Sequence, residues 1–102
     1  MSTVYTATVV EATPLTLREL AQAVGAEERW IVQLVEVEIL HVDTPADPPE
    51  HWHFRSDALQ RALAARRLER DFGANLDAAA LILDLQQELR RLHALLAAHG
   101  LA

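Results

Sequence analysis

The chain has 102 residues, of which 51% are hydrophobic, so it is long enough for one domain with a core of its own. It contains no cysteine, which excludes disulfide bonds and thiolate metal sites. The formal net charge of −6 argues against general nucleic-acid binding, which needs a surplus of cations, and favours a basic partner.

The first predicted elements are a strand and a short helix. Residues 3–11 alternate and are rich in Val and Thr, which predicts a strand. Thr16 and Glu19 have the spacing of a capping box, so a helix should follow, and Gly25 should end it. The predicted inward face of this helix consists of Leu17, Leu20, Ala21 and Val24.

A second helix is predicted over residues 26–40. Glu27 and Glu28 lie in its first turn, where the helix dipole favours negative charge. Its inward face would contain Ile31, Leu34 and Val35, with Val37 or Leu40. Two short helices joined at a glycine are typical of a helix-turn-helix, but any small helical hairpin has the same outline.

A loop and a wing should come next. Residues 43–50 contain three prolines, which prevent regular strand pairing there. The apolar segments on either side, residues 39–42 and 51–54, are predicted to pair as a two-stranded wing. Trp52 and Phe54 would then form the aromatic part of the core beneath this wing.

A third helix should begin at Ser56 or Asp57 and run to Phe72. The predicted inward face consists of Leu59, Ala62, Leu63, Leu68 and Phe72. Four arginines are expected to face mostly water: Arg61, Arg66, Arg67 and Arg70.

The last predicted element is a long helix over residues 75–99, after a head formed by residues 1–72. Gly73 can end the third helix in a left-handed conformation, and Asn75 can cap the new one. Its apolar residues follow the 3-4-3-4 spacing of a heptad seam: Ile82, Leu85, Leu89, Leu92 and Leu96. The head can cover this helix to about Leu85, so we expect its second half to pair with another copy, most naturally antiparallel about a two-fold axis. The predicted dimer interface is Leu85, Leu89, Leu92 and Leu96; alternatively, these leucines pack on the chain's own head.

This order of elements resembles the winged-helix head of MerR-type regulators, and more closely the CbpM family of chaperone modulators. The residues that carry the resemblance are Trp52-His-Phe54, Arg67-Leu68, Asp71-Phe72, Gly73-Ala-Asn75-Leu76 and Leu81-Ile-Leu-Asp-Leu85. Ala78 stands where the family often has glycine, which affects close helix packing and not the fold. The fold expected is therefore mainly α: a MerR-like winged helix-turn-helix with a small β wing and a long C-terminal dimerisation helix.

The resemblance implies a function. Proteins like CbpM bind the J-domain of CbpA, a DnaJ-like co-chaperone, and block its productive meeting with the chaperone DnaK. They can also interfere with the binding of CbpA to DNA. J-domains generally present a basic helix, which an acidic surface would complement. From charge and expected exposure, the predicted contact residues are Glu27, Glu28, Trp30, Glu36 and Glu38. Trp30 would be an aromatic anchor if exposed and a core residue if buried.

The main alternative is a MerR-type DNA-binding transcriptional regulator, and a further one is a dimerisation adaptor of unassigned partner. MerR-like recognition helices usually carry an Arg-Tyr-Tyr stretch where this chain has Val32-Gln33-Leu34. The nearby glutamates would face phosphates and repel them, so DNA binding is disfavoured. The arginines of the third helix are the feature that keeps this alternative open.

Metal binding, catalysis and membrane insertion find little support in the sequence. His51 and His53 would share one face of a strand, with His41 nearby, but the spacing fixes no third conventional ligand, so we predict no metal. The carboxylates of the long helix lack a cleft, and no phosphate loop or activated nucleophile is visible, so we predict neither an enzyme nor a cofactor. The chain lacks a signal-peptide pattern and a spanning apolar run, and its arginine-only basic composition suggests a GC-rich bacterial genome. We therefore expect a cytoplasmic bacterial protein.

Overall fold

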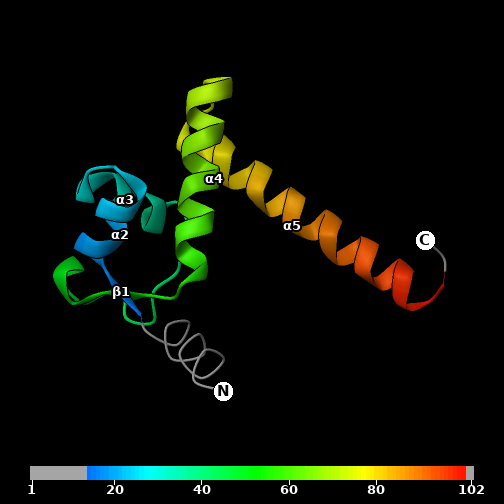
Figure 1. The fold of residues 1–102 in the computed structure, drawn as a ribbon, viewed down its shortest axis with the longest axis horizontal. Helices are drawn as coiled ribbons and strands as arrows, with labels where there is room; N and C mark the ends of the chain where they lie inside the picture. Colours follow the sequence, from blue (N-terminus) through cyan, green and yellow to red (C-terminus); the bar gives the residue numbers. More distant parts are fainter. Residues whose placement is uncertain (1–13, 101–102) are drawn as a thin grey trace, which may run out of the picture.

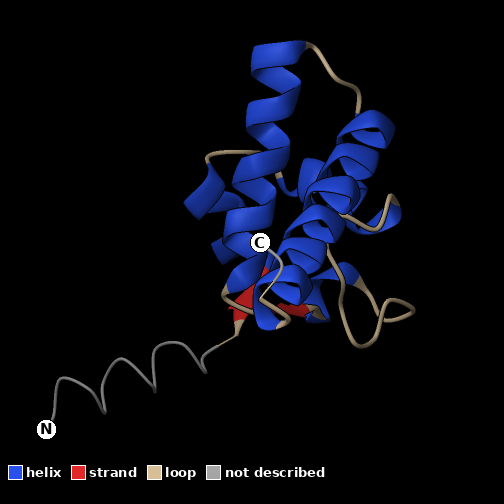
Figure 2. Cartoon of the chain, turned by 90° about the vertical axis from the view of Figure 1, so that its right-hand side faces the viewer, coloured by secondary structure: helices blue, strands red, loops and turns tan. Residues whose placement is uncertain are grey.

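The computed structural model describes residues 14–100, which form mainly α-helices with a two-stranded sheet (Figures 1 and 2). The elements in chain order are β1 Leu15–Thr16, α2 Leu17–Val24, α3 Glu28–Glu36, the 3₁₀ helix η1 Pro49–His51, β2 His53–Phe54, α4 Asp57–Phe72 and α5 Leu76–Ala98. In Figure 1, α2 and α3 lie together beside α4. The helix α5 starts near the end of α4 and runs away from α2 and α3. This confirms the predicted fold class. The strand predicted over residues 3–11 lies outside the described residues.

The first helix, α2, is fixed at both ends by the predicted local signals. The Thr16 amide donates to Glu19 Oε1 at 2.9 Å, and the Glu19 amide donates to Thr16 Oγ1 at 3.1 Å, which completes the capping box. Gly25 ends the helix in the left-handed region with φ of 78°. The four residues predicted to face inward are all buried: Leu17, Leu20, Ala21 and Val24.

The helix α3 follows after a short turn and completes the helix-turn-helix, but it ends four residues earlier than predicted. Glu38 adopts a left-handed φ of 64°. The Glu38 amide donates to the Val35 carbonyl at 3.0 Å, and the Ile39 amide donates to the Leu34 carbonyl at 2.9 Å. These two bonds form a Schellman motif, which turns the chain so that Ile39 and Leu40 leave the helix and enter the core.

The pairing predicted for the wing is wrong. The strand β2 pairs antiparallel with β1, with Leu15 opposite Phe54 and Thr16 opposite His53, and not with residues 39–42. Because Ile39 and Leu40 are buried in the core directly after α3, their segment is not free to form a strand. The aromatic part of the prediction is confirmed, since Trp52 and Phe54 are buried and their rings pack edge to face, with 6.3 Å between the ring centroids.

Small residues decide which face of α4 packs on α2. The buried residues of α4 are Ala58, Ala62 and Ala65. Three members of the predicted inward face do pack inward: Ala62 is buried, and Leu59 and Leu68 are partly buried against the core. Alanine lets two helices approach closely. Leu63 and Phe72 were predicted to be buried and are instead 40% and 75% exposed, because Leu63 lies outside the alanine face and Phe72 lies beyond the end of the core.

The long helix α5 begins as predicted and then leaves the head, by which we mean residues 14–72. Gly73 is left-handed with φ of 64°, and Asn75 Oδ1 accepts from the Ala78 amide at 2.8 Å. Ala79 and Leu83 are the buried residues of this helix. Residues 84–98 therefore extend beyond the core, and at about 1.5 Å per residue this segment is about 22 Å long. Figure 1 shows α5 running away from the other helices.

Candidate functional site

The acidic residues of α3 and its flanks lie on the surface. Glu27, Glu28, Glu36 and Glu38 are all exposed. Glu27 lies 3.7 Å from Arg29, and Glu28 lies 4.0 Å from Arg18. More than half of each of these side chains is accessible to solvent, so the two pairs neutralise little charge.

The other end of α3 carries acidic charge without a counter-ion. Glu36 and Glu38 form no ion pair with any residue in the range 14–100. The last turn of α3 contains no basic residue either, so the partial negative charge of the helix C-terminus adds to that of the two carboxylates. The strongest negative potential of this helix therefore lies at its C-terminal end.

Glu38 also occupies a position that glycine usually fills. A left-handed residue with a side chain costs on the order of 1 kcal/mol, because its Cβ crowds the backbone. This chain has a glutamate there, with φ of 64° and an exposed side chain. The carboxylate is thus presented at some expense of stability.

Trp30 is neither fully exposed, as an aromatic anchor would be, nor fully buried, as a core residue would be. Its ring is half-buried and packs against the core cluster. Its Nε1 atom is buried and has no hydrogen-bond acceptor among the described residues. Trp30 is therefore not a freely exposed anchor, although part of its surface remains accessible beside α4.

Two of the four arginines predicted to face water bind the backbone instead. Arg66 Nη1 donates to the carbonyls of Val24 and Gly25, the latter at 2.9 Å, and so caps the C-terminal end of α2. Arg61 Nε donates to the Ile39 carbonyl at 2.7 Å. No signal in the sequence identifies these contacts, because they join residues more than 20 positions apart. Arg67 and Arg70 are exposed, as predicted.

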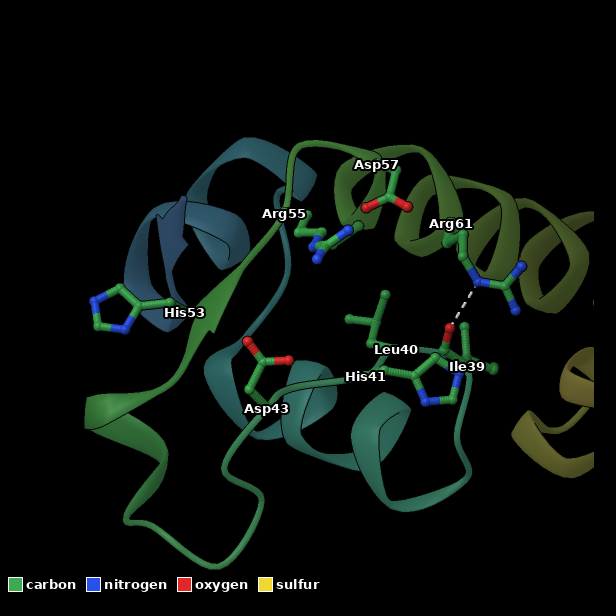
Figure 3. Close-up of a pocket in the computed structure, with 9 residues that line it drawn as sticks. Ile39, Leu40, His41, Asp43, His53, Arg55, Asp57 and Arg61 are labelled. Carbon is green, nitrogen blue, oxygen red and sulfur yellow. Dashed lines mark hydrogen bonds between the residues drawn. The ribbon is translucent and has the colours of Figure 1, made fainter. Parts of the chain in front are cut away.

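A polar hollow of about 280 Å³ lies between the chain after α3 and the start of α4 (Figure 3). Arg61 closes one side of it through the bond to Ile39, and Leu40 lies below the opening. His41 and His53, two of the histidines considered for a metal, border this hollow, and His53 points away from its centre. Within residues 14–100, no group of three or more metal-binding side chains comes together.

The exposed leucines of α5 form a stripe on the side of the helix that faces away from α4. We call this surface the leucine stripe; it consists of Leu81, Leu85, Leu89, Leu92 and Leu96, which are 41–61% exposed. At about 100° per residue, these positions lie about 160–240° around the helix from the buried Leu83. The stripe can therefore be covered without displacing α4.

The opposite side of α5 becomes polar where the head ends. Gln87 and Arg90 continue the line of Leu83, and Gln87 accepts a hydrogen bond from Arg61 at 3.3 Å. At the edge of the stripe, Arg91 Nε donates to Glu88 Oε2 at 3.1 Å, and this hydrogen bond lowers the pKa of the Glu88 carboxyl below its usual value. The leucine stripe is thus bordered by polar residues, as an interface between helices would be.

A search of the helices over residues 14–100 finds none that is both long enough and apolar enough to cross a membrane.

Comparison with known proteins identifies the family. Residues 15–98 match the family described as "MerR HTH family regulatory protein". The chain is also 30% identical over 84 residues to proteins named "Chaperone modulatory protein CbpM" from the Dugway and Henzerling II strains of Coxiella burnetii; the match covers 82% of this chain and 77% of each relative. No solved structure matches significantly. The helix-turn-helix head and long C-terminal helix described above, together with these matches, show that the chain belongs to the MerR helix-turn-helix family of regulatory proteins and is a CbpM-like member of it.

Proposed function

We propose that this protein is a non-catalytic chaperone modulator of the bacterial cytoplasm. In this proposal it binds the J-domain of a DnaJ-like co-chaperone of the CbpA type and inhibits the work of that co-chaperone with DnaK. The observation that carries the proposal is the 30% identity over 84 residues to relatives named chaperone modulatory proteins. The acidic surface of α3 supports it, because a J-domain generally presents a basic helix.

The charge distribution favours a particular region of contact. Of the five predicted contact residues, Glu36 and Glu38 combine exposure with the absence of an ion pair among the described residues. Complementary charge at such a surface accelerates association and rejects acidic partners, and its effect weakens as salt is added. We therefore place the electrostatic part of the J-domain contact at the C-terminal end of α3, with Glu27 and Glu28 extending it.

A DNA-binding regulator of the MerR type remains the alternative function, and the family description favours it. The charges of the described surface oppose it. DNA binding requires cations at the phosphates, but the exposed side of α3 and its flanks carries four glutamates against one arginine. Two arginines of α4 that could have met a DNA backbone, Arg61 and Arg66, are bound to main-chain carbonyls.

We also propose that the protein acts as a homodimer. Each chain would be a single domain composed of the head and the long helix. The leucine stripe of one copy would pack on that of a second copy. Four of its leucines, Leu85, Leu89, Leu92 and Leu96, have the 4-3-4 spacing of a heptad seam, which suits a partner helix, and the other residues of the range 14–100 leave them exposed. An antiparallel arrangement about a two-fold axis would let each copy use the same residues.

Binding measurements with a purified J-domain test the main proposal. We expect binding at low salt that weakens as salt is added, and inhibition of the J-domain-stimulated ATPase activity of DnaK. The double variant Glu36→Lys with Glu38→Lys should bind at least about 10-fold more weakly, since reversing charges at a complementary surface removes steering and adds repulsion. Glu50→Lys, which reverses an exposed charge outside α3, is the control and should bind normally. No binding to the J-domain at low salt, combined with tight binding to duplex DNA, would favour the alternative.

A further inference from the structure

A hollow of about 280 Å³ lies between the start of α3 and the second half of α4, at the opposite end of α3 from Glu36 and Glu38. It is lined by Gly25, Ala26, Glu27, Trp30, Arg66 and Glu69. The turn between α2 and α3 leaves this space open, because glycine and alanine contribute no large side chain there. A Cβ on Gly25 would lie 3.1 Å from Arg66 Nη1, so the absence of a side chain at this position leaves room for the guanidinium.

Two carboxylates and one guanidinium line this hollow, so the formal charge of its wall is −1. The guanidinium is that of Arg66, whose Nη1 donates to the two carbonyls at the end of α2, where the partial negative charge of the helix offsets part of the positive charge. Glu69, by contrast, is exposed and forms no ion pair within the described part of the chain. Glu27, on the facing element, is paired at 3.7 Å with an arginine side chain that is 83% exposed, and water screens that contact strongly.

An aromatic surface accompanies these two carboxylates. Trp30 lines the hollow with the accessible part of its half-buried ring, and a tryptophan face attracts a cationic group. Phe72 follows Glu69 by three residues on α4, so it lies on the same face one helical turn further on. Its side chain is 75% exposed, which makes it the most exposed large apolar side chain of the described residues.

We propose that this hollow is the seat of one lysine or arginine side chain from the basic helix of the J-domain, with an apolar side chain of that helix packing on Phe72. The proposal rests on the proposed function and names a second point of contact for the same partner. The cation would lie between Glu27 and Glu69 over the ring of Trp30. Charge complementarity selects this occupant, because the hollow combines two carboxylates with an aromatic floor and an adjoining apolar side chain.

Two variants of α4 and one matched control test the seat. Glu69→Gln removes one charge at nearly constant volume and should weaken J-domain binding about 5-fold, with the difference disappearing at high salt. Phe72→Ala should weaken binding about 10-fold at all salt concentrations, as expected of an aromatic contact residue. Leu63→Ala also truncates an exposed apolar residue of α4, about 180° around the helix from Phe72, and should change binding less than about 2-fold.

A fluorescence measurement on the unmodified protein provides an independent readout. Trp52 is buried at 5% exposure, so Trp30 is the tryptophan accessible to a quencher such as acrylamide. Saturating J-domain should protect Trp30 from quenching, and unchanged quenching in the complex would overturn the seat.

The outcomes separate this inference from the proposed function. If the unmodified protein does not bind the J-domain, both fall. If it binds, and Glu36→Lys with Glu38→Lys weakens binding while Glu69→Gln and Phe72→Ala do not, the seat alone is overturned. A Phe72→Ala variant that loses self-association along with J-domain binding would assign that side chain to contacts between copies and would also overturn the seat.

Discussion

The leucine stripe of α5 allows a quantitative test of dimer formation. Leu85 is 60% exposed and Leu92 is 45% exposed, so a second copy could bury about half of each side chain. Complete burial of a leucine is worth about 1.5–3 kcal/mol, and half of that is about 1 kcal/mol. Across a two-fold axis each position counts twice. The double variant Leu85→Ala with Leu92→Ala should therefore lose about 4 kcal/mol of association free energy, or about 700-fold in the dissociation constant.

Sedimentation velocity over a wide concentration series measures this change directly. Alanine is the best helix former, so the two substitutions by themselves should not weaken the helix, and a loss of helix content by circular dichroism should accompany dissociation of the dimer. Gln86→Ala is the matched control, since Gln86 is exposed on the same helix and lies outside the leucine stripe. Our reasoning is refuted if the unmodified protein sediments as a monomer at every concentration, or if the double variant dissociates over the same range as the control.

Three further predictions concern single side chains. Glu38→Gly should raise the free energy of unfolding in urea by about 1 kcal/mol, because glycine adopts the left-handed conformation without strain, while weakening J-domain binding; a loss of stability would contradict this. Arg66→Met should lower the free energy of unfolding by about 1–2 kcal/mol, since two carbonyls at the end of α2 lose their donor, and Arg66→Lys should recover part of that loss in the same assay. The pKa of Glu88, measured by carbon-detected NMR titration, should lie below the usual carboxyl value and return to it in Arg91→Ala. Because the folded pKa is lowered, the stabilising contribution of this pair is present above the usual carboxyl pKa and is lost as the pH falls through the lowered one; a pKa that Arg91→Ala leaves unchanged would contradict the assignment.

The elements that could be predicted from the sequence are those fixed by local signals. The capping box at Thr16 and Glu19, the left-handed glycines at positions 25 and 73, and the cap at Asn75 all act within four residues of the chain. Their energies depend on the backbone of one helix end and hardly on the rest of the molecule. The starts of α3 and α4 have no side-chain cap hydrogen bond, and α3 begins two residues later than predicted.

The predictions failed where the structure depends on contacts between segments that are distant in the sequence. The choice of β1 as the partner of β2 depends on where the chain goes after α3, and the left-handed Glu38 that redirects it carries no glycine signal. The packing face of α4 was predicted only in part: Ala62, Leu59 and Leu68 face the core as expected, but Leu63 and Phe72 do not, because size was taken as a guide to burial. The roles of Arg61 and Arg66 were missed because their acceptors are main-chain carbonyls of other elements.

The candidate surfaces were predictable to different degrees. The acidic residues of α3 could be expected on the surface, because the apolar positions of this helix define its inward side. The heptad spacing located Leu85, Leu89, Leu92 and Leu96 but placed Ile82, and not Leu81, at the start of the stripe. The hollow at Trp30 could not be predicted, because it depends on how α3 lies against α4 and on where the Arg66 guanidinium points.

The length of α5 beyond the head has a consequence for dynamics. No contact among residues 14–100 buries residues 84–98, and an isolated helix of about 15 residues is only marginally formed in water. In a lone copy, the backbone amides of this segment should exchange their hydrogens quickly while those near Leu83 stay protected. Pairing of two copies would then order the segment, so its exchange rate should fall as the protein concentration rises.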